Sequence, residues 1–100
     1  MTMTRAIWFR DRARFEACAT PGSFRLEERE TPGLFEFVYF CPCGCGVEGR
    51  LLVGAGQKPG GPRPSWRWNG SATEPSLDPS VHHRGHWHGW LRDGYWEACA

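Results

Sequence analysis

Three cysteines occupy alternate positions in residues 41–46 (CPCGCG), with only Pro and Gly between them. Clustered cysteines can pack as small hydrophobic side chains, but a run interleaved with Pro and Gly makes poor core material. Zn²⁺ binds thiolates in a tetrahedron at about 2.3 Å, whereas alternate residues of a strand stand roughly 6.5–7 Å apart. The chain must therefore curl around the ion, which Gly44 and Gly46 permit. The segment predicts a zinc site whose sulfur ligands are Cys41, Cys43 and Cys45.

All four histidines lie in residues 81–88 (VHHRGHWH). His86 and His88 are two residues apart, so they share a face of the strand expected there, and Trp87 points away from it. His82 and His83 are expected in a loop, and adjacent side chains diverge on an extended backbone, so they are less suited to share one ion. The predicted metal ligands are Cys41, Cys43, Cys45, His86 and His88, and which four of the five bind is left open.

The remaining cysteines, Cys18 and Cys99, are isolated in the sequence and are expected to be buried thiols. Five is an odd number of cysteines, and three of them lie within five residues, which argues against a disulfide framework. Free thiols are typical of a reducing compartment. We therefore expect the protein in the cytoplasm of a bacterial cell.

Length and charge exclude several other classes of protein. One hundred residues suit a single domain over 1–100, and 40% are hydrophobic, including six Trp and six Phe. The longest apolar stretch, residues 34–41, is too short to cross a bilayer, and the first five residues do not form a signal peptide. The net charge of +1 offers little attraction for nucleic acid. Membrane, secreted and disordered proteins are therefore excluded.

The residue pattern favours short strands joined by turns. A hairpin is predicted over residues 23–41 with its turn at 31–33, and a second over residues 86–97 with its turn at Asp93 and Gly94. The predicted fold class is α+β, mostly β: a small zinc-stabilised antiparallel sheet of hairpins with one short N-terminal helix. The remaining predictions are strands at 6–9, 50–53 and 66–68, a helix at 11–19, a Gly/Pro-rich loop at 54–64 and a rigid extended loop at 75–80.

Four motifs follow one another at residues 37–46, 65–70, 74–81 and 86–96. In this order they resemble an uncharacterised family of small bacterial and bacteriophage proteins that is often mislabelled ammonia monooxygenase. The resemblance implies a zinc-binding domain with the cysteine triplet and His88 as ligands. Many relatives carry a Cys just upstream of that histidine, where this chain has His86. Ammonia oxidation needs a membrane-embedded copper enzyme, so the label has no physical support here.

Two functions are weighed from these residues. Three thiolates and one histidine fill a tetrahedral zinc site, which favours a structural metal in a phage or prophage accessory protein that binds a protein partner. The alternative is a zinc-dependent hydrolase with an open metal position. Some relatives are encoded beside ubiquitin-like conjugation genes, which implies an isopeptidase role for that branch. The candidate bases of the zinc hydrolase are Glu36, Glu48 and Glu74.

A serine nucleophile is a separate candidate. A catalytic Ser76 or Ser80 would need a nearby base, and the only histidines are those assigned to zinc.

Overall fold

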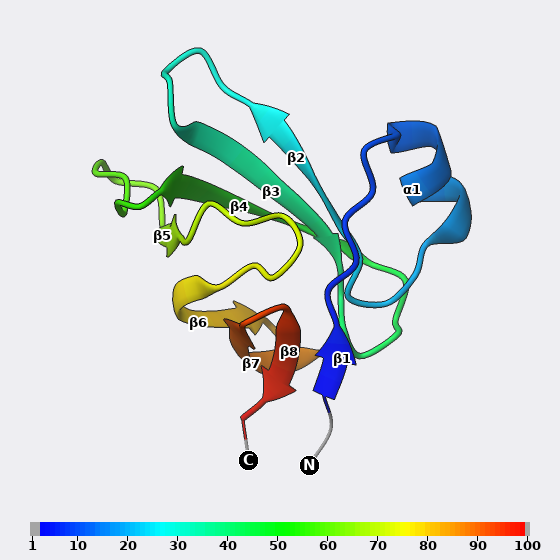
Figure 1. The fold of residues 1–100 in the computed structure, drawn as a ribbon. Helices are drawn as coiled ribbons and strands as arrows, with labels where there is room; N and C mark the ends of the chain where they lie inside the picture. Colours follow the sequence, from blue (N-terminus) through cyan, green and yellow to red (C-terminus); the bar gives the residue numbers. More distant parts are fainter. Residues whose placement is uncertain (1–2, 100) are drawn as a thin grey trace.

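The computed structural model describes residues 3–99, and within them the strands form one curled sheet (Figure 1). Its order is β1-β8-β7-β6-β5-β4-β3-β2. Neighbouring strands are antiparallel except β4 and β5, which are parallel. The elements are β1 (Met3–Arg5), α1 (Arg12–Cys18), β2 (Phe24–Glu28), β3 (Leu34–Phe40), β4 (Glu48–Ala55), β5 (Ser65–Trp68), β6 (Leu77–His83), β7 (Trp87–Arg92) and β8 (Tyr95–Ala98).

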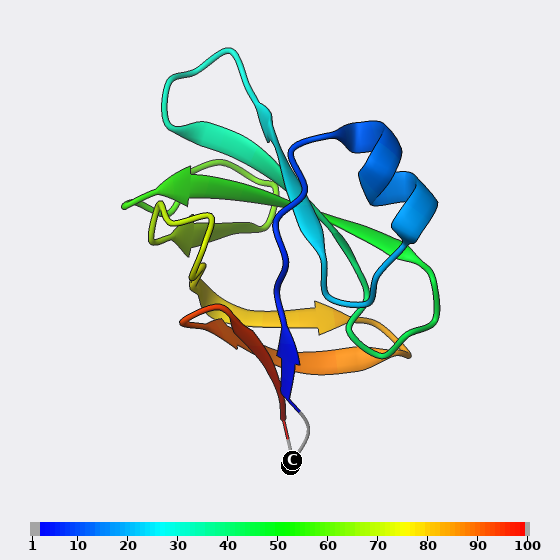
Figure 2. The same cartoon turned by 45° about the vertical axis from the view of Figure 1, so that its right-hand side comes forward.

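The two edges of the sheet are joined by residues 6–9, which run from β1 to β2 (Figure 2). The Ala6 amide donates to the Gly94 carbonyl at 2.8 Å. Further along, Phe9 N donates to Phe24 O and Phe24 N donates to Ile7 O, both at 2.9 Å. This segment continues from β1 and pairs with backbone groups of β2, the strand at the other edge of the sheet. The sheet is thereby closed into a small barrel.

The inside of the barrel is filled mainly by aromatic side chains. Phe24 and Phe37 stack with their ring centroids 4.5 Å apart, and Trp96 packs edge-on against Phe37 at 6.3 Å. The buried indole of Trp96 donates to the Gly22 carbonyl at 2.8 Å, so its one polar atom is satisfied. The rest of this core consists of Ala6, Tyr39, Leu51, Val53, Trp68, Leu77, Val81 and Leu91.

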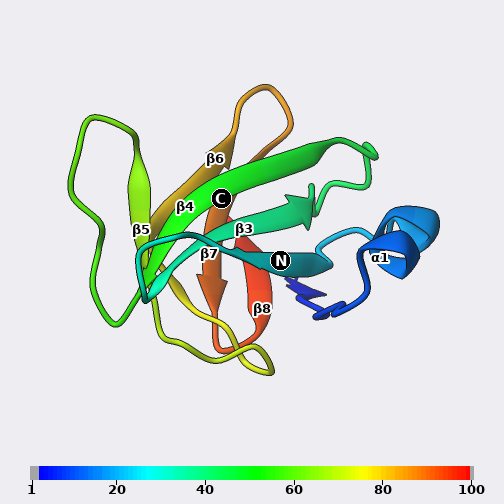
Figure 3. The same ribbon diagram turned by 90° about the horizontal axis from the view of Figure 1, so that it is seen from above.

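Helix α1 covers part of the outside of the sheet. Asp11 caps it by accepting a hydrogen bond from Ala13 N at 3.0 Å. Phe15 is buried against Phe40, with the ring centroids 4.7 Å apart, in a second small cluster that includes Val38. Figure 3 shows the helix beyond the ends of β2 and β3, away from β5. Within the described part of the chain, no helix has the length and apolarity that crossing a membrane requires.

Most elements predicted from the sequence are confirmed, including both hairpins, the helix and the strand at 66–68. The strand expected at residues 6–9 is wrong, because β1 lies before it and only Trp8 forms a bridge there. The loop expected at 75–80 is wrong from Leu77 onward, where β6 begins. His82 and His83 therefore lie in a strand, not a loop.

The expected burial of Cys18 and Cys99 is also wrong, since both side chains are exposed. Cys18 is the last residue of α1, a helix that buries only Phe15. Cys99 follows the end of β8, where its amide donates to the His88 carbonyl at 2.8 Å. Neither position faces a core.

A candidate metal centre and a serine–histidine pair

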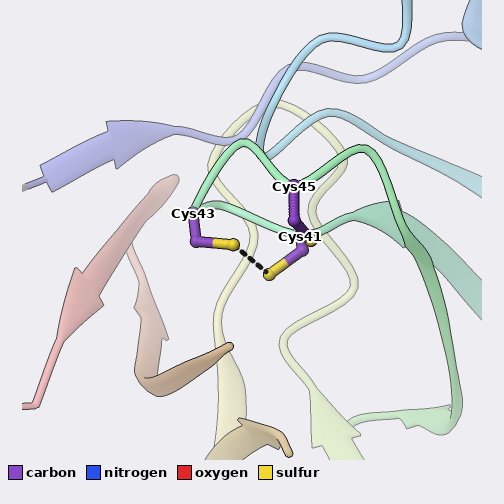
Figure 4. A group of neighbouring side chains, drawn as sticks. All are labelled: Cys41, Cys43 and Cys45. Carbon is purple, nitrogen blue, oxygen red and sulfur yellow. Dashed lines mark hydrogen bonds between the residues drawn. The ribbon is translucent and has the colours of Figure 1, made fainter. Parts of the chain in front are cut away.

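The loop between β3 and β4 brings the three predicted sulfur ligands together. Their Sγ atoms all lie within 4.8 Å of one another, and those of Cys41 and Cys43 face each other at 3.3 Å (Figure 4). The loop is closed by hydrogen bonds from Cys41 N to Val47 O at 3.0 Å and from Gly44 N to Cys41 O at 3.1 Å. Gly44 and Gly46 take φ values of +86° and +80°, the curl that the sequence predicted.

The electrostatics of this loop disfavour three thiolates without a counter-ion and suit a bound cation. Burial raises the pKa of the Cys41 thiol to about 12, whereas the hydrogen bond with Cys41 lowers the pKa of Cys43. Burial, followed by the charges of Cys41 and Cys45, raises the pKa of Tyr39 to about 12. A divalent ion would stabilise the thiolates and remove this repulsion. The donor set therefore fits a soft metal such as Zn²⁺.

His86 lies at the end of the barrel near this loop but outside the sulfur group. It belongs to the turn between β6 and β7, with its ring centroid 5.2 Å from that of His83. The His83 ring in turn contacts Tyr39 at 6.1 Å, and its Nδ1 is buried without a hydrogen-bond partner. Figures 1 and 2 place this turn beside the β3–β4 loop. A fourth ligand from this turn is still a prediction.

His88, the other predicted ligand, points to the outside of the barrel and contacts a serine. Its Nε2 lies 3.2 Å from Oγ of Ser80. The centroid of the His82 ring lies 4.8 Å from that of the His88 ring. The Trp90 ring stacks against His88 with the centroids 6.3 Å apart and the ring planes inclined by 30°. His88 is exposed, while Ser80 and Trp90 are half-buried. The arrangement presents a hydroxyl and an imidazole together on an accessible face.

The pairing of β6 with β7 explains how these side chains meet. His82 is the register partner of His88, and Val81 that of Gly89, but the next pair is Leu77 with Leu91. Residues 78–80 of β6 thus lie opposite a single residue of β7, Trp90. The extra residues on β6 form a β-bulge. Bulges re-aim side chains and occur often beside active sites. The Ser80 carbonyl accepts a hydrogen bond from the Trp66 indole at 3.0 Å, which holds the bulge.

Gly89, between His88 and Trp90, allows β7 and β8 to pack closely at this point. A Cβ built at this position would overlap the Glu97 carbonyl oxygen and come within 2.7 Å of the Trp87 ring. The two outward side chains of β7, His88 and Trp90, therefore flank a position that has no room for a side chain.

Comparison with known families bears on this pair. The sequence model of a family described as the bacterial ubiquitination-like system serine protease (BubE) matches residues 10–99. The chain belongs to the BubE family. Searches of curated proteins and of solved structures found no match.

The contact between Ser80 and His88 is a pairing that the sequence did not reveal. Ser80 was placed in a loop without a base, and His88 was assigned to the metal. One signal could have found the pair: in the hairpin formed by residues 77–92, a short turn at 84–86 brings His88 opposite the residues just after Ser80. The BubE match also bears out a bacterial family, while the bacteriophage connection stays a prediction.

Proposed function

We propose that this protein is a serine protease that cleaves an amide bond in a bacterial ubiquitination-like system, with Ser80 as nucleophile and His88 as general base. The observation that carries the proposal is the 3.2 Å contact between Ser80 Oγ and His88 Nε2, in a chain of the BubE family. A nucleophile and a base within hydrogen-bond reach are the minimum that serine hydrolysis needs.

The chemistry follows from this geometry. With the proton of the imidazole on Nδ1, His88 Nε2 accepts the hydroxyl proton as Ser80 Oγ attacks the substrate carbonyl carbon. The C–N bond then breaks, and the leaving amine takes the proton from His88, which leaves an ester on Ser80. A water molecule next attacks the ester carbon and gives a proton to His88. That proton returns to Ser80 as the acid product departs.

The packing around His88 supplies the orientation that a carboxylate gives in many serine proteases. Over residues 3–99, the one side-chain hydrogen bond of His88 is that with Ser80. Its ring instead contacts the rings of His82 at 4.8 Å and Trp90 at 6.3 Å. These contacts limit rotation of the imidazole, so that Nε2 continues to face Ser80.

The proposal also covers the metal. Cys41, Cys43 and Cys45 would hold Zn²⁺, which would brace the β3–β4 loop without taking part in the reaction. Since His88 serves as the base, His86 is the predicted ligand that stays available to the ion. Its turn lies at the same end of the barrel as the cysteine loop. The protein partner expected from the sequence becomes, in this proposal, the protein substrate.

The zinc-hydrolase alternative gains less support. Glu36, one of the carboxylates considered as its base, is buried and bound by Arg63, at 2.7 and 2.8 Å, and by Arg29. In the portion of the chain that the structure describes, no carboxylate joins the sulfur group. Glu48, another carboxylate considered as the base, is the exposed register partner of Phe40 at the end of the loop.

The decisive experiment is labelling of the purified protein with a fluorophosphonate, which reacts with activated serines. We expect the label on Ser80, loss of labelling in Ser80→Ala, and strongly slowed labelling in His88→Gln. Ser71→Ala is the matched control, because the Ser71 hydroxyl accepts a hydrogen bond from Glu74 N at 3.0 Å and, over residues 3–99, has no histidine partner. Unchanged labelling of Ser80→Ala would overturn the proposal.

A further inference from the structure

A groove of about 390 Å³ lies on the outside of β5, β6 and β7, next to the serine–histidine pair. Asp78, two residues before Ser80, and Trp90, two residues after His88, both line it. The groove therefore lies beside the pair, with its near end two residues from Ser80 on β6 and two residues from His88 on β7. Its volume falls in the range of sites that hold small ligands or short peptide segments.

The groove is bounded by the backbone of the strands that carry the core residues Leu77, Leu91 and Trp68. The half-buried Trp90 ring provides apolar surface at the end nearest the pair. Strand backbone and an aromatic ring suit the backbone and aliphatic parts of an extended chain. The charged side chains at the rim then decide which substrate side chains are accepted.

The rim carries more positive than negative charge. Arg67 lies 3.8 Å from the Asp78 carboxylate, so that pair is close to neutral. Arg92 has its guanidinium over the Trp90 ring, 4.8 Å from the centroid, and forms no ion pair within residues 3–99. This contact holds the guanidinium in place, and its N–H donors remain available to bind a carboxylate in a bidentate manner.

We propose that this groove binds the acyl-side segment of the substrate and selects an acidic side chain through Arg92. This inference rests on the proposed function, because it assigns a subsite of the same centre. The acyl part stays attached to Ser80 through both steps, whereas the amine leaves after the first. A groove beside the nucleophile is therefore best used by the part of the substrate that stays.

The test uses peptidyl aminophosphonate esters, which react with activated serines and carry their peptide on the acyl side. Probes with Glu or Gln at each of the three positions before the phosphorus are compared by their rate of labelling Ser80. At one of these positions, we expect the Glu probe to label Ser80 about tenfold faster than the Gln probe. Arg92→Gln removes that preference, and Arg92→Glu reverses it for a matching Lys probe. Arg84→Gln, in the turn at the other end of β6 and β7, keeps it.

The outcomes separate this inference from the proposed function. A simple fluorophosphonate reports the pair alone, so each variant's Glu and Gln probe rates are divided by its own fluorophosphonate rate before they are compared. Labelling of Ser80 by that reagent without any Glu preference, or with a preference that survives in Arg92→Gln, would overturn the groove assignment only. Absence of any Ser80 labelling would overturn both. Because Arg92 is exposed, these variants are expected to fold, which circular dichroism checks.

Discussion

Ser80 Oγ and His88 Nε2 lie 3.2 Å apart on neighbouring strands, although eight residues separate them in the sequence. The contact depends on two features of β6 and β7: the pairing of His82 with His88, and the bulge at residues 78–80. The candidate nucleophile and base thus belong to one hairpin of a rigid sheet. A site built on paired strands holds its geometry better than one on separate loops.

Removal of the ring that packs on His88 should slow catalysis more than it weakens binding. We expect His82→Ala to lower kcat about tenfold with little change in KM, since rotation of the base lengthens its path to Ser80. His82→Phe, which keeps a flat ring, should restore most of the rate. Steady-state hydrolysis of a fluorogenic substrate measures both constants, and equal rates for His82→Ala and wild type would contradict a positioning role.

A methyl group added at Gly89 should destabilise the protein. The new Cβ would overlap the Glu97 carbonyl oxygen and press on Trp87, and such overpacking costs about 1–3 kcal/mol. Denaturant unfolding followed by Trp fluorescence gives the free energy of unfolding. Gly60→Ala is the control, because a Cβ there has no neighbour within 4 Å. Equal losses in the two variants would show that the close packing at Gly89 is unimportant.

Zinc should stabilise the fold through the cysteine loop. We expect about one Zn²⁺ per chain by elemental analysis, and loss of the metal in Cys43→Ser. At zinc one hundredfold above its Kd, binding contributes about 2.7 kcal/mol, so a chelator should lower Tm by roughly 10–20 °C.

The exposed, isolated Cys18 provides the control for this test. Cys18→Ser should keep both the metal and the Tm of the wild-type protein. A wild-type protein purified without metal, whose Tm ignores added zinc, would refute the prediction. Co²⁺ substitution adds a spectroscopic readout, since thiolate-to-cobalt charge-transfer bands should weaken in Cys43→Ser and persist in Cys18→Ser.

Acid should destabilise the fold through the arginine-bound carboxylates on the outside of β2–β4. Hydrogen bonds from Arg50 and then Arg25 lower the pKa of Glu27 from 4.5 to about 2. Because the folded-state pKa is the lower one, this stabilisation is present above pH 4.5 and is lost as the pH falls toward 2. The free energy of unfolding should therefore fall across this window, and less steeply in Glu27→Gln.

Two comparisons make this pH test specific. Glu30→Gln changes an exposed carboxylate that forms no ion pair in the described part of the chain, so its pH profile should follow that of the wild type. Glu36, whose pKa is lowered chiefly by Arg63, should behave like Glu27. A Glu27→Gln profile parallel to the wild-type one would exclude the proposed origin of the acid sensitivity.

Features encoded in a few neighbouring residues could be predicted from the sequence. The cysteine loop is one, since the spacing of Cys41, Cys43 and Cys45 and the intervening glycines already require a tight curl. The hairpin of β7 and β8, with its turn at Asp93 and Gly94, is another. In both, the partners are so close in sequence that local geometry decides the outcome.

Features that depend on distant pairing could not be predicted. The bulge in β6 breaks the regular alternation of a strand, so residues 75–80, with two prolines, resembled a loop. Without that strand, Ser80 had no visible partner, and His88 was free to be assigned to the metal. The parallel pairing of β4 with β5 and the burial of Glu36 among arginines likewise join residues that no local pattern connects.

The segment at residues 6–9 links β1, at one edge of the sheet, to β2, at the other edge. It contributes only a few backbone hydrogen bonds: one to Gly94 O, just before β8, and two with Phe24 of β2. A protease nick there would leave two strands with unpaired backbone facing solvent. Intermolecular strand exchange would then be the readiest way to pair them.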